Sequence, residues 1–577
     1  MKNQEIANIF RMIAIYLEMK DIAFKPQAYE RAAYSIEALD EDIEEFLKKN
    51  GKEGLKNLPG VGESIAEKII EYLKTGKIKE FEELKKEVPV DIENLTKIEG
   101  IGPKTIYKLY KALGIKNIDD LEKACLEHKI KRLPGFGEKS EKKILQSIQF
   151  YKQSGGRFVL GFIIPVVEEL VSYLKESKLV DQIEVCGSYR RKKETVGDID
   201  ILVTTSQAEK LMDYFISYKN VIYVYGKGPT KTMVRLSNNL DVDLRVVDKN
   251  SFGAALAYFT GSKEHNIKIR EIAIKKGWKL NEYGLFDSNE KVIAGKTEEE
   301  IYEKLGLQWI PPEMRENKGE IELALKNKLP KLIDYDSLKG DLQVQTNWSD
   351  GQNSIEEMVK EAIKLKLEYV CITDHTKSLS VAGGLDEKRI LEQFKEIDRL
   401  NKKYKGKITI LKGAEVNINK DGSLDISDEI LAQMDFVGAA IHTYFDLPRN
   451  IQTERLKRAM LNPYVNCIFH PTGRIINKRP AYEIDIDEII NFAKKTKKIL
   501  EIDAYPDRLD LKDDHIKKCV EKGVKMVIDS DAHSILHLKF LSLGIAQARR
   551  GWAEKKDILN TLNLKEFLSY LNKSKKL

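Results

Sequence analysis

The chain has 577 residues, of which 42% are hydrophobic and 33% are charged, and its formal net charge at pH 7 is +6. This length predicts several domains, and the composition excludes a disordered or fibrous protein. There is no apolar run long enough to cross a bilayer and no secretory signal at the start, so we expect a cytoplasmic protein without a membrane partner. Five scattered cysteines without a CxxC pair indicate reduced thiols.

Residues 1–80 are predicted to be helical, because apolar residues recur at helical spacing. A unit of apolar-x-Gly-apolar-Gly before a helix then occurs three times, within 58–73, 98–109 and 133–145. These repeats resemble helix-hairpin-helix motifs, in which glycines let a DNA backbone approach the amides at a helix N-terminus. A plain helical turn with glycine caps is the alternative. The candidate DNA contacts are Gly60, Gly62, Gly100, Gly102, Lys104, Gly135 and Gly137.

Two carboxylates, Asp198 and Asp200, stand one residue apart among apolar residues that predict a strand. Side chains alternate along a strand, so both carboxylates point to the same face. Two like charges on one packed face are costly unless a cation lies between them. Hard divalent ions such as Mg²⁺ prefer oxygen ligands of this kind. The spacing therefore predicts a metal site, with an acidic strand edge as the alternative.

Just before these carboxylates, Gly187-Ser188 is predicted to form a small-residue turn where backbone can approach a phosphate, and Arg190-Arg191 supply positive charge. The combination of G-S-Y-R-R with G-D-I-D resembles the signature of the family X DNA polymerases, which are nucleotidyltransferases. The resemblance implies template-directed addition of deoxynucleotides. It also implies that Gly187, Ser188, Arg191 and Gly197 bind the nucleotide.

Polymerase chemistry of this type needs a third carboxylate on a neighbouring strand, and D-V-D-L-R-V-V at 241–247 offers one. By the family pattern the ligand is Asp243, but Asp241 lies on the same face and the spacing alone does not exclude it. Three carboxylates can hold two Mg²⁺ or Mn²⁺ ions, one activating the primer 3′-hydroxyl and one bridging the triphosphate. For Arg235 and Arg245, contact with primer or triphosphate and a plain surface role both stay open.

The resemblance gives residues 1–80 a second expected activity. In this family the amino-terminal domain removes a 5′-deoxyribose phosphate through a lysine Schiff base, and that lysine corresponds to Lys68. Lys25 and Tyr29 correspond to the phosphate-binding lysine and the tyrosine of that domain. A nucleophilic lysine needs burial or neighbouring cations, and neither is visible in a sequence, so an ordinary surface lysine is the alternative for Lys68.

Residues 251–317 contain A-Y-F-T-G-S-K-E-H-N-I-K-I-R, which resembles the fingers subdomain of the same family. The resemblance implies contacts to the sugar of the incoming nucleotide, to its minor-groove edge and to the template side. Lys263 stands where the family stacks a side chain on the base, so stacking there is in doubt. The implied contacts are Tyr258, Phe259, Gly261, Asn266 and Arg270.

Residues 318–338 are predicted to be a helical linker, and from 339 to 577 strand-like runs alternate with amphipathic helices, as in a β/α barrel. Metal-type side chains follow several of these strands, where barrel enzymes gather catalytic groups. The ordered set resembles the PHP domain that bacterial family X polymerases carry at their C-terminus. The implied metal ligands are Asp350, His375, Glu415, His442, His470, Asp531 and His533.

For the PHP domain the resemblance implies bound Mn²⁺ or Zn²⁺ and a 3′→5′ exonuclease, sometimes with abasic-site endonuclease activity. The opening motif is normally His-x-His, but here it is Gln343-Val344-Gln345, and an amide oxygen is a weak ligand for a transition metal. Asp374 is expected to bind or to orient the ligands. We expect weakened nuclease activity, because the other ligand positions are intact; a purely structural domain is the alternative.

The sequence thus predicts a multidomain protein: an all-α helix-hairpin-helix region with a lyase-like domain (1–80) and a thumb-type subdomain (81–150), an α+β palm (151–250) with fingers (251–317), and a β/α barrel-like PHP domain (339–577). The predicted function is a monomeric DNA polymerase that uses deoxynucleoside triphosphates to fill gaps in primed DNA during base excision repair. A nucleotidyltransferase acting on RNA or a small acceptor is one alternative, and the hairpin repeats argue against it. A DNA-end-binding scaffold is the other, and the retained carboxylates argue against it.

Overall fold

The computed structural model describes residues 2–22, 25–37, 39, 41–58, 60–96, 98, 101–154, 157–477 and 479–575. The chain divides into two compact units, residues 1–157, 169–185 and 197–249 in one and residues 158–168, 186–196 and 250–577 in the other. Helix α10 (Leu160–Glu176) passes from the second unit to the first, so the predicted palm belongs to both. None of the described helices combines the length and the apolar character needed to cross a membrane.

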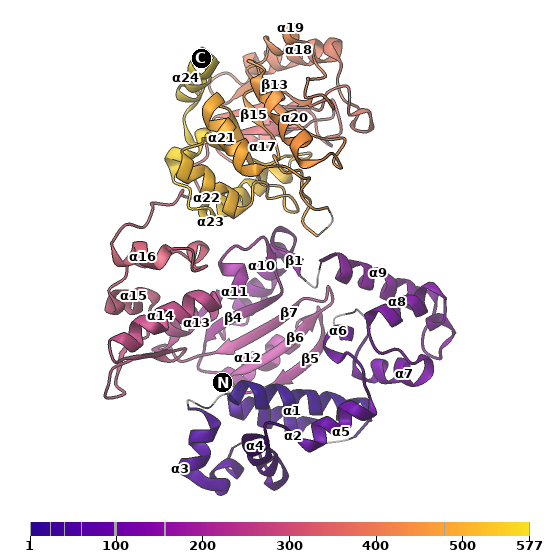
Figure 1. Ribbon diagram of the computed structural model, residues 1–577, viewed down its shortest axis with the longest axis vertical. Coiled ribbons are helices and arrows are strands. Elements are labelled where there is room, and N and C mark those ends of the chain that lie inside the picture. The colour runs from indigo at the N-terminus through magenta and orange to yellow at the C-terminus, as the bar shows by residue number, and fades with distance from the viewer. Residues whose placement is uncertain are drawn as a thin grey trace. The chain divides into compact units, whose positions relative to one another are not determined.

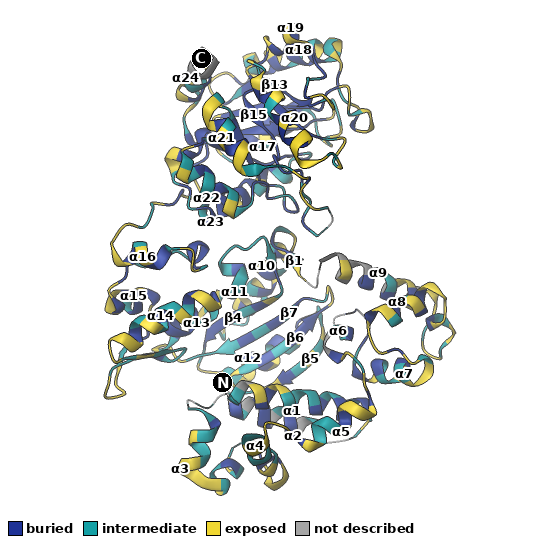
Figure 2. Cartoon of the chain, viewed as in Figure 1, coloured by how far each residue is buried: buried dark blue, intermediate teal, exposed yellow. Residues whose placement is uncertain are grey.

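The amino-terminal part of the first unit is helical, as predicted (Figure 1). The apolar face of each helix is directed inward and the polar face outward, which the burial pattern in Figure 2 shows. Phe10, Ile69 and Ile106 belong to one common core, so the hairpin repeats share a single packed interior. The helices are α1 (Lys2–Met19), α2 (Lys25–Glu37), α3 (Ile43–Lys56), α4 (Glu63–Thr75), α5 (Lys79–Glu87), α6 (Ile92–Leu95), α7 (Pro103–Leu113), α8 (Ile118–Leu126) and α9 (Glu138–Ser154).

The rest of the first unit is a mixed sheet with the strand order β2-β4-β7-β6-β5 and the helix α12 (Ala208–Ile216). Strands β4 and β7 are parallel neighbours at its centre, and the other pairs are antiparallel. Both strands predicted to carry carboxylates are therefore present and adjacent. The strands are β2 (Gln182–Val185), β4 (Asp198–Thr204), β5 (Val221–Lys227), β6 (Lys231–Leu236) and β7 (Asp241–Val246).

In the second unit, the predicted turn at Gly187-Ser188 is instead the start of a one-turn helix, α11 (Gly187–Arg190). The amide of Arg190 donates to the Cys186 carbonyl at 3.1 Å, which closes the helical turn. Gly187 has a φ of +63°, a region that glycine enters without a steric penalty, so the glycine is needed even though the segment is helical.

The segment from 250 to 330 contains the small antiparallel sheet β10-β9-β8 and several helices around a core that includes Ile269 and Tyr302. The predicted linker contains helix α16. A short pair, β1 with β3, precedes this segment in the chain. The elements are β1 (Phe158–Val159), β3 (Thr195–Val196), α13 (Phe252–Thr260), α14 (Lys263–Lys275), β8 (Lys279–Asn281), β9 (Gly284–Phe286), β10 (Val292–Ala294), α15 (Glu298–Leu305) and α16 (Glu320–Leu325).

The carboxy-terminal region is a parallel sheet whose strands follow chain order from β11 to β17. A bridge between Val344 and Ala532 brings the last strand back to the first, so the sheet is a nearly closed barrel, as predicted. The strands are β11 (Gly340–Val344), β12 (Tyr369–Ile372), β13 (Thr409–Asn417), β14 (Phe436–Ala440), β15 (Cys467–Ile468), β16 (Ile499–Asp503) and β17 (Met526–Asp529). The helices are α17 (Ile355–Lys364), α18 (Glu387–Lys403), α19 (Asp428–Leu431), α20 (Arg449–Leu461), α21 (Ile486–Thr496), α22 (Asp513–Lys522), α23 (Leu541–Arg550) and α24 (Leu564–Lys575).

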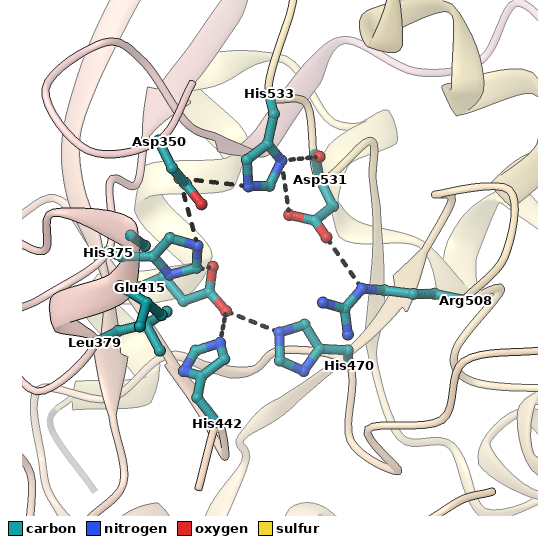
Figure 3. Close-up of a pocket in the computed structure, with 11 residues that line it drawn as sticks. Asp350, His375, Leu379, Glu415, His442, His470, Arg508, Asp531 and His533 are labelled. Carbon is teal, nitrogen blue, oxygen red and sulfur yellow. Dashed lines mark hydrogen bonds and ion pairs between the residues drawn. The ribbon is translucent and has the colours of Figure 1, made fainter. Parts of the chain in front are cut away.

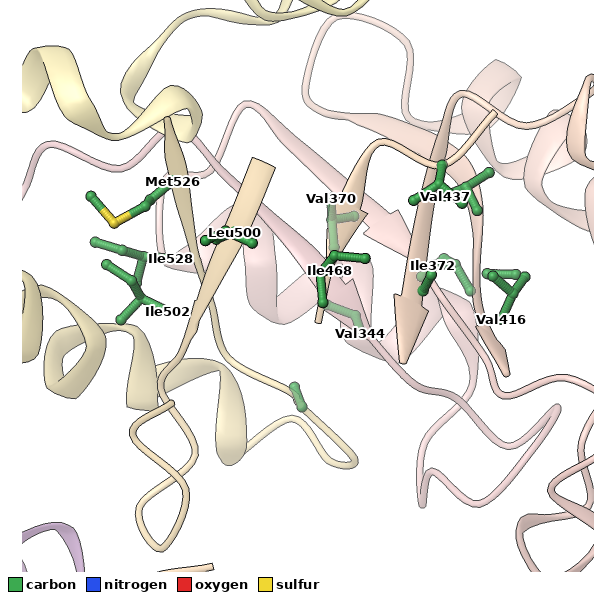
Figure 4. Packing of buried hydrophobic residues seen from close by; sticks show 14 of the residues in the cluster. Val344, Val370, Ile372, Val416, Val437, Ile468, Leu500, Ile502, Met526 and Ile528 are labelled. Carbon is green, nitrogen blue, oxygen red and sulfur yellow. The ribbon is translucent and has the colours of Figure 1, made fainter. Parts of the chain in front are cut away.

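Many apolar side chains of these strands form one core with helices of the barrel (Figure 4), and others, such as Leu342 and Phe436, form a second cluster. Val370, Ile502 and Ile528 belong to the core and are completely buried. Burial of a side chain of this size contributes about 1.5–3 kcal/mol, so the core fixes the strands firmly. Because parallel strands all end at the same edge, the polar residues that follow them are brought to one end of the barrel.

Candidate functional site

The palm carboxylates lie where β4 and β7 run side by side. Asp198 is opposite Asp241, and Asp200 is opposite Asp243. Since side chains at every second position share a face, all four carboxylates lie on one face of the sheet. The structure thus brings together the three predicted ligands and also Asp241, the alternative third ligand that the sequence left open.

Asp241 and Asp243 differ in their hydrogen-bond partners. Arg235 donates two hydrogen bonds to Asp241, at 2.8 and 2.9 Å, and the Tyr225 hydroxyl donates a third at 3.1 Å. Asp243 Oδ1, in contrast, is buried and has no hydrogen-bond partner among the described residues, while Oδ2 lies 3.2 Å from Lys231 Nζ. A buried carboxylate oxygen without a partner is costly unless a ligand binds it. The third-ligand candidate is therefore Asp243, and Asp241 is held by structural partners.

Asp200 is hard to ionise in this site. Burial, together with the charges of Asp243 and Asp198, raises the pKa of Asp200 to about 7. A divalent cation would reverse this effect by stabilising the ionised form. Among the described residues, three-residue groups with all ligand atoms within 4.8 Å of one another occur in the barrel and not here, so an ion would draw these carboxylates closer. The donor set, all carboxylate oxygens, fits Mg²⁺ or Mn²⁺.

The arginines of the G-S-Y-R-R segment are already paired. Arg190 makes a two-bond ion pair with the buried Glu298, at 2.7 and 2.9 Å, and Arg191 Nε is 3.1 Å from Glu316 Oε1. Glu298 also accepts two hydrogen bonds from Arg315, which is completely buried. No local pattern of residues indicates this buried ion cluster. Of the other predicted contacts, Ser188 lies on α11 and Gly197 directly precedes β4.

The predicted fingers contacts lie around the junction of α13 and α14. Tyr258, Asn266 and Arg270 line one small cavity, and Asn266 Nδ2 donates to the Tyr258 carbonyl at 2.7 Å. The rings of Tyr258 and Phe259 pack edge to face, with centroids 5.1 Å apart. Gly261 ends α13 with a φ of +70°, which favours glycine. The three cavity residues are thus positioned together, with the asparagine fixing the local backbone.

The hairpin glycines leave the helix N-termini open. Gly62 and Gly102 are the N-caps of α4 and α7, and Gly137 directly precedes α9. A Cβ at any of these three positions would meet nothing within 4 Å. Gly60 and Gly135 have φ of +84° and +86°, as tight turns require. The open N-termini fit contact with a phosphate backbone.

In the second hairpin repeat, Lys104 has an aspartate as its partner. Gly100 lies outside the described residues. Lys104 Nζ is 2.7 Å from Asp21 Oδ1, and both side chains are exposed. An exposed ion pair is worth little, so a DNA phosphate can replace the aspartate as the partner of Lys104.

Lys68 and Tyr29 meet through Glu80, a residue that the sequence did not single out. The Tyr29 hydroxyl donates to Glu80 Oε2 at 2.6 Å, and Lys68 Nζ is 3.1 Å from the same oxygen. Lys68 Nζ also donates to the Ser64 hydroxyl at 2.7 Å. Although burial opposes ionisation, the hydrogen bonds from Tyr29 and Lys68 lower the pKa of Glu80. Lys25 is exposed on the first turn of α2.

At the strand ends of the barrel, the predicted ligands converge on one cavity of about 250 Å³ (Figure 3). Two groups have all their ligand atoms within 4.8 Å of one another: Asp350 with His375 and His533, and His375 with Glu415 and His442. His470 Nε2 lies 2.8 Å from Glu415 Oε1. The lining residues include all seven predicted ligands, Asp350, His375, Glu415, His442, His470, Asp531 and His533.

Neighbouring side chains orient these ligands. His442 Nδ1 is 2.7 Å from Asn417 Oδ1, so Nδ1 carries the proton and Nε2 faces Glu415 as a ligand atom. Asp374 is buried and accepts hydrogen bonds from Thr346 and Ser349. It therefore holds the segment after β11 in place and does not line the cavity.

One functional candidate in this cavity was missed from the sequence. Arg508 lines the cavity, and its guanidinium points into the ring of ligands in Figure 3. Its Nε lies 3.3 Å from Asp531 Oδ2 and 3.4 Å from Asp503 Oδ2. The surrounding letters, P-D-R-L-D, follow no ligand pattern, so only the fold reveals this residue.

The donor sets in the barrel fit a transition metal at two positions and not at a third. The two groups around His375 combine imidazole and carboxylate ligands, as Mn²⁺ and Zn²⁺ require. At the glutamine pair, Gln343 Nε2 and Gln345 Nε2 point at Glu415 Oε2, at 3.1 and 2.9 Å. These amides offer protons to the carboxylate instead of lone pairs to a metal.

Family models match five parts of the chain. The matches are a helix-hairpin-helix domain at residues 1–78, a SAM-like helix-hairpin-helix tandem at 92–149, a DNA polymerase beta palm at 163–235, a DNA polymerase beta thumb at 255–316 and a PHP domain at 341–504. The thumb model covers the segment that we assigned to the fingers.

Among curated relatives, the "DNA polymerase/3'-5' exonuclease PolX" of Bacillus subtilis is 39% identical over 582 residues, covering 100% of each chain. Probable phosphatases of Thermoanaerobacter sp. and Caldicellulosiruptor bescii are each 34% identical, over 31% of this chain and 73% of the relative. With paired carboxylates on adjacent palm strands and metal ligands at the end of a barrel, this full-length match shows that the chain belongs to the family X DNA polymerases that carry a C-terminal PHP domain.

Proposed function

We propose that this polymerase fills short gaps in primed DNA during base excision repair. The observation that carries the proposal is the parallel pair β4–β7, which sets Asp198 and Asp200 beside Asp243 and leaves a buried Asp243 oxygen without a partner. The three carboxylates would hold Mg²⁺ or Mn²⁺. When bound, such ions activate the primer 3′-hydroxyl and neutralise charge on the triphosphate.

The chain's own groups supply positioning. Tyr258, Asn266 and Arg270 share one cavity, which suits the sugar and base edge of the incoming nucleotide. The open N-termini of α4 and α7 suit the DNA backbone on either side of a gap. Contacts of this kind do not depend on base sequence, so the template alone would select the nucleotide.

Primer extension on one-nucleotide-gapped DNA tests this proposal. Wild type is expected to insert the nucleotide complementary to the template and to stop at the 5′ end of the gap. Asp198→Ala should be slower by at least ~10³-fold, because a metal ligand is lost. Unchanged extension by that variant would remove the palm carboxylates from the reaction.

We infer that the amino-terminal domain is a 5′-deoxyribose-phosphate lyase with Lys68 as the nucleophile. The support is the cluster in which Lys68 and Tyr29 share Glu80, with Lys25 exposed nearby in the chain. A Schiff base forms when the free amine attacks the sugar aldehyde, with loss of water, and borohydride reduces the resulting imine. Trapping on incised abasic DNA should fail for Lys68→Ala; equal trapping by both proteins would exclude Lys68.

For the barrel we propose a Mn²⁺-dependent 3′→5′ exonuclease, with abasic-site endonuclease as a related activity. The support is the two ligand groups around His375 in a cavity of about 250 Å³, and the activity in the name of the B. subtilis relative. These residues would hold the metal, which supplies a hydroxide nucleophile when bound. Arg508 offers a fixed positive charge for a phosphodiester.

Release of label from a 3′-labelled single strand with Mn²⁺ tests the nuclease. His442→Ala should abolish the release, because it removes an imidazole from one of the two ligand groups. Activity that survives this change would place the nuclease elsewhere. If a 3′-phosphorylated strand lost only inorganic phosphate, the site would be a phosphatase, the activity in the names of two relatives.

A further inference from the structure

The glutamine pair occupies one oxygen of Glu415 completely. Gln343 and Gln345 are fully buried, and their Nε2 atoms lie 3.1 and 2.9 Å from Glu415 Oε2. A carboxylate oxygen has two lone pairs, so two amide donors saturate it. The opposite oxygen, Oε1, lies 2.9 Å from His442 Nε2 and 2.8 Å from His470 Nε2. Glu415 can therefore offer a lone pair to a metal through Oε1 but not through Oε2, which also lies 3.4 Å from His375 Nδ1.

The glutamine oxygens do not rescue the missing ligands. Both Oε1 atoms are buried and have no hydrogen-bond partner in the part of the chain that the structure describes. Each amide is oriented by its donor end, because a carboxylate accepts protons and repels an amide oxygen. With both Nε2 atoms on Glu415 Oε2, the pair acts as a donor clamp on that oxygen.

A permanent positive charge also lines the cavity that contains Glu415. Arg508 Nε lies 3.3 Å from Asp531 Oδ2, and the side chain lines the cavity with Glu415 and Asp531. A guanidinium stays protonated in proteins, so its charge persists whether or not a metal is bound. Two amides and one guanidinium together supply what a divalent cation supplies to carboxylates, namely proton donors and positive charge.

We propose that Gln343, Gln345 and Arg508 replace one metal ion in the barrel, so that metal binding is confined to the two groups around His375. The inference rests on the proposed function of the barrel as a metal-dependent phosphodiesterase and deepens it. It explains why Glu415 can stay buried with two amide donors on one oxygen. The substrate phosphate would then meet a metal on the His375 side and Arg508 on the other.

Metal content tests the proposal directly. The full-length protein is equilibrated with Mn²⁺, freed of unbound ion, and analysed for Mn²⁺ per chain. The test variant is Gln343→His with Gln345→His, which turns two donors into two lone-pair ligands. The matched control, Gln207→His with Gln433→His, adds two histidines at exposed positions. We expect about one additional Mn²⁺ per chain in the test variant and none in the control.

Equal Mn²⁺ content in wild type and the test variant would overturn the proposal, because the native pair would then already hold the ion. If the double variant does not fold, Gln345→His alone, which replaces the closer amide, carries the same comparison. Label release from a 3′-labelled strand is measured in parallel. If the test variant gains Mn²⁺ and wild type has no nuclease activity, this inference stands and the proposed nuclease is refuted. If wild type releases the label strongly and the test variant gains no Mn²⁺, the proposed nuclease stands and this inference is refuted.

Discussion

At the scale of single residues, we predict that Asp200 makes polymerase activity depend on pH. Its pKa is raised to about 7 by burial and by the neighbouring carboxylates, so below pH 7 a proton competes with the metal. The ionised fraction falls from about nine tenths at pH 8 to about one tenth at pH 6. With the Mg²⁺–dNTP concentration held constant, half-saturating Mg²⁺ should rise about tenfold from pH 8 to pH 6. The same Mg²⁺ requirement at both values would contradict this account.

A second prediction at the residue scale concerns the ion pair of Glu80. It holds Lys68 in an ion pair, and the amine must leave that pair to attack a sugar. The pair is only partly buried, so its net stabilisation is at most about 1 kcal/mol, or roughly fivefold. Borohydride trapping by Glu80→Gln should therefore be faster than in wild type by up to about fivefold. Slower trapping would show that Glu80 assists the reaction instead of restraining the lysine.

The placement of single side chains could be predicted where it follows from alternation along a strand, and not where it depends on register. The shared face of Asp198 and Asp200 follows from the two-residue repeat of a strand alone. The pairing of Asp241 with Arg235 could not be predicted, because it depends on the antiparallel register of β6 and β7, which sets these two residues opposite each other. Arg508 was missed for the same reason, because its loop reaches the cavity only after the barrel closes.

At the scale of elements, substitutions in the hairpin turns allow an effect on DNA binding to be measured apart from an effect on folding. Gly62 and Gly102 have φ of −88° and −93°, which any residue can adopt, and an added Cβ meets nothing within 4 Å. Gly62→Ala with Gly102→Ala should therefore keep the fold, with only a small fall in melting temperature, because alanine is a poorer N-cap residue than glycine. The new methyl groups stand where a phosphate would approach, so affinity for duplex DNA should fall about threefold to tenfold.

Binding measured by anisotropy on a labelled duplex checks this prediction, with the melting temperature of the same protein as its control. Unchanged affinity would mean that the repeats only pack helices. The elements themselves were predictable because each combines a clear helical period with glycine punctuation. The turn at Gly187 was not, since four residues are too few for a period and the helix is closed by backbone bonds alone.

At the scale of the whole molecule, the hairpin repeats and the modest net charge of +6 give a prediction about salt. Contacts to DNA phosphates release counterions, so log Kd should rise linearly with log salt concentration, with a slope near 0.9 for each phosphate contacted. We expect a slope of at least about 3 on gapped DNA, and the same slope for unrelated sequences. A flat response between low and moderate salt would contradict binding through the backbone.

The order of the helical, mixed and barrel-like regions could be predicted along almost the whole chain, because each has its own motif or period. The composition of the two units could not. Residues 186–196 belong to the second unit although they lie between two palm strands in sequence, and the ion pairs of Arg190 and Arg191 with Glu298 and Glu316 hold them there. Pairing across more than 100 residues leaves no local signal in a sequence.

The central claim is that Asp198, Asp200 and Asp243 form the polymerase site and that Asp241 does not. The most direct test is the rate of insertion into a one-nucleotide gap by Asp243→Asn and by its matched control Asp241→Asn, on the same strand face. The account predicts a loss of at least ~10³-fold for Asp243→Asn and less than about tenfold for the folded control. Similar rates for the two variants, or a larger loss in Asp241→Asn, would contradict it.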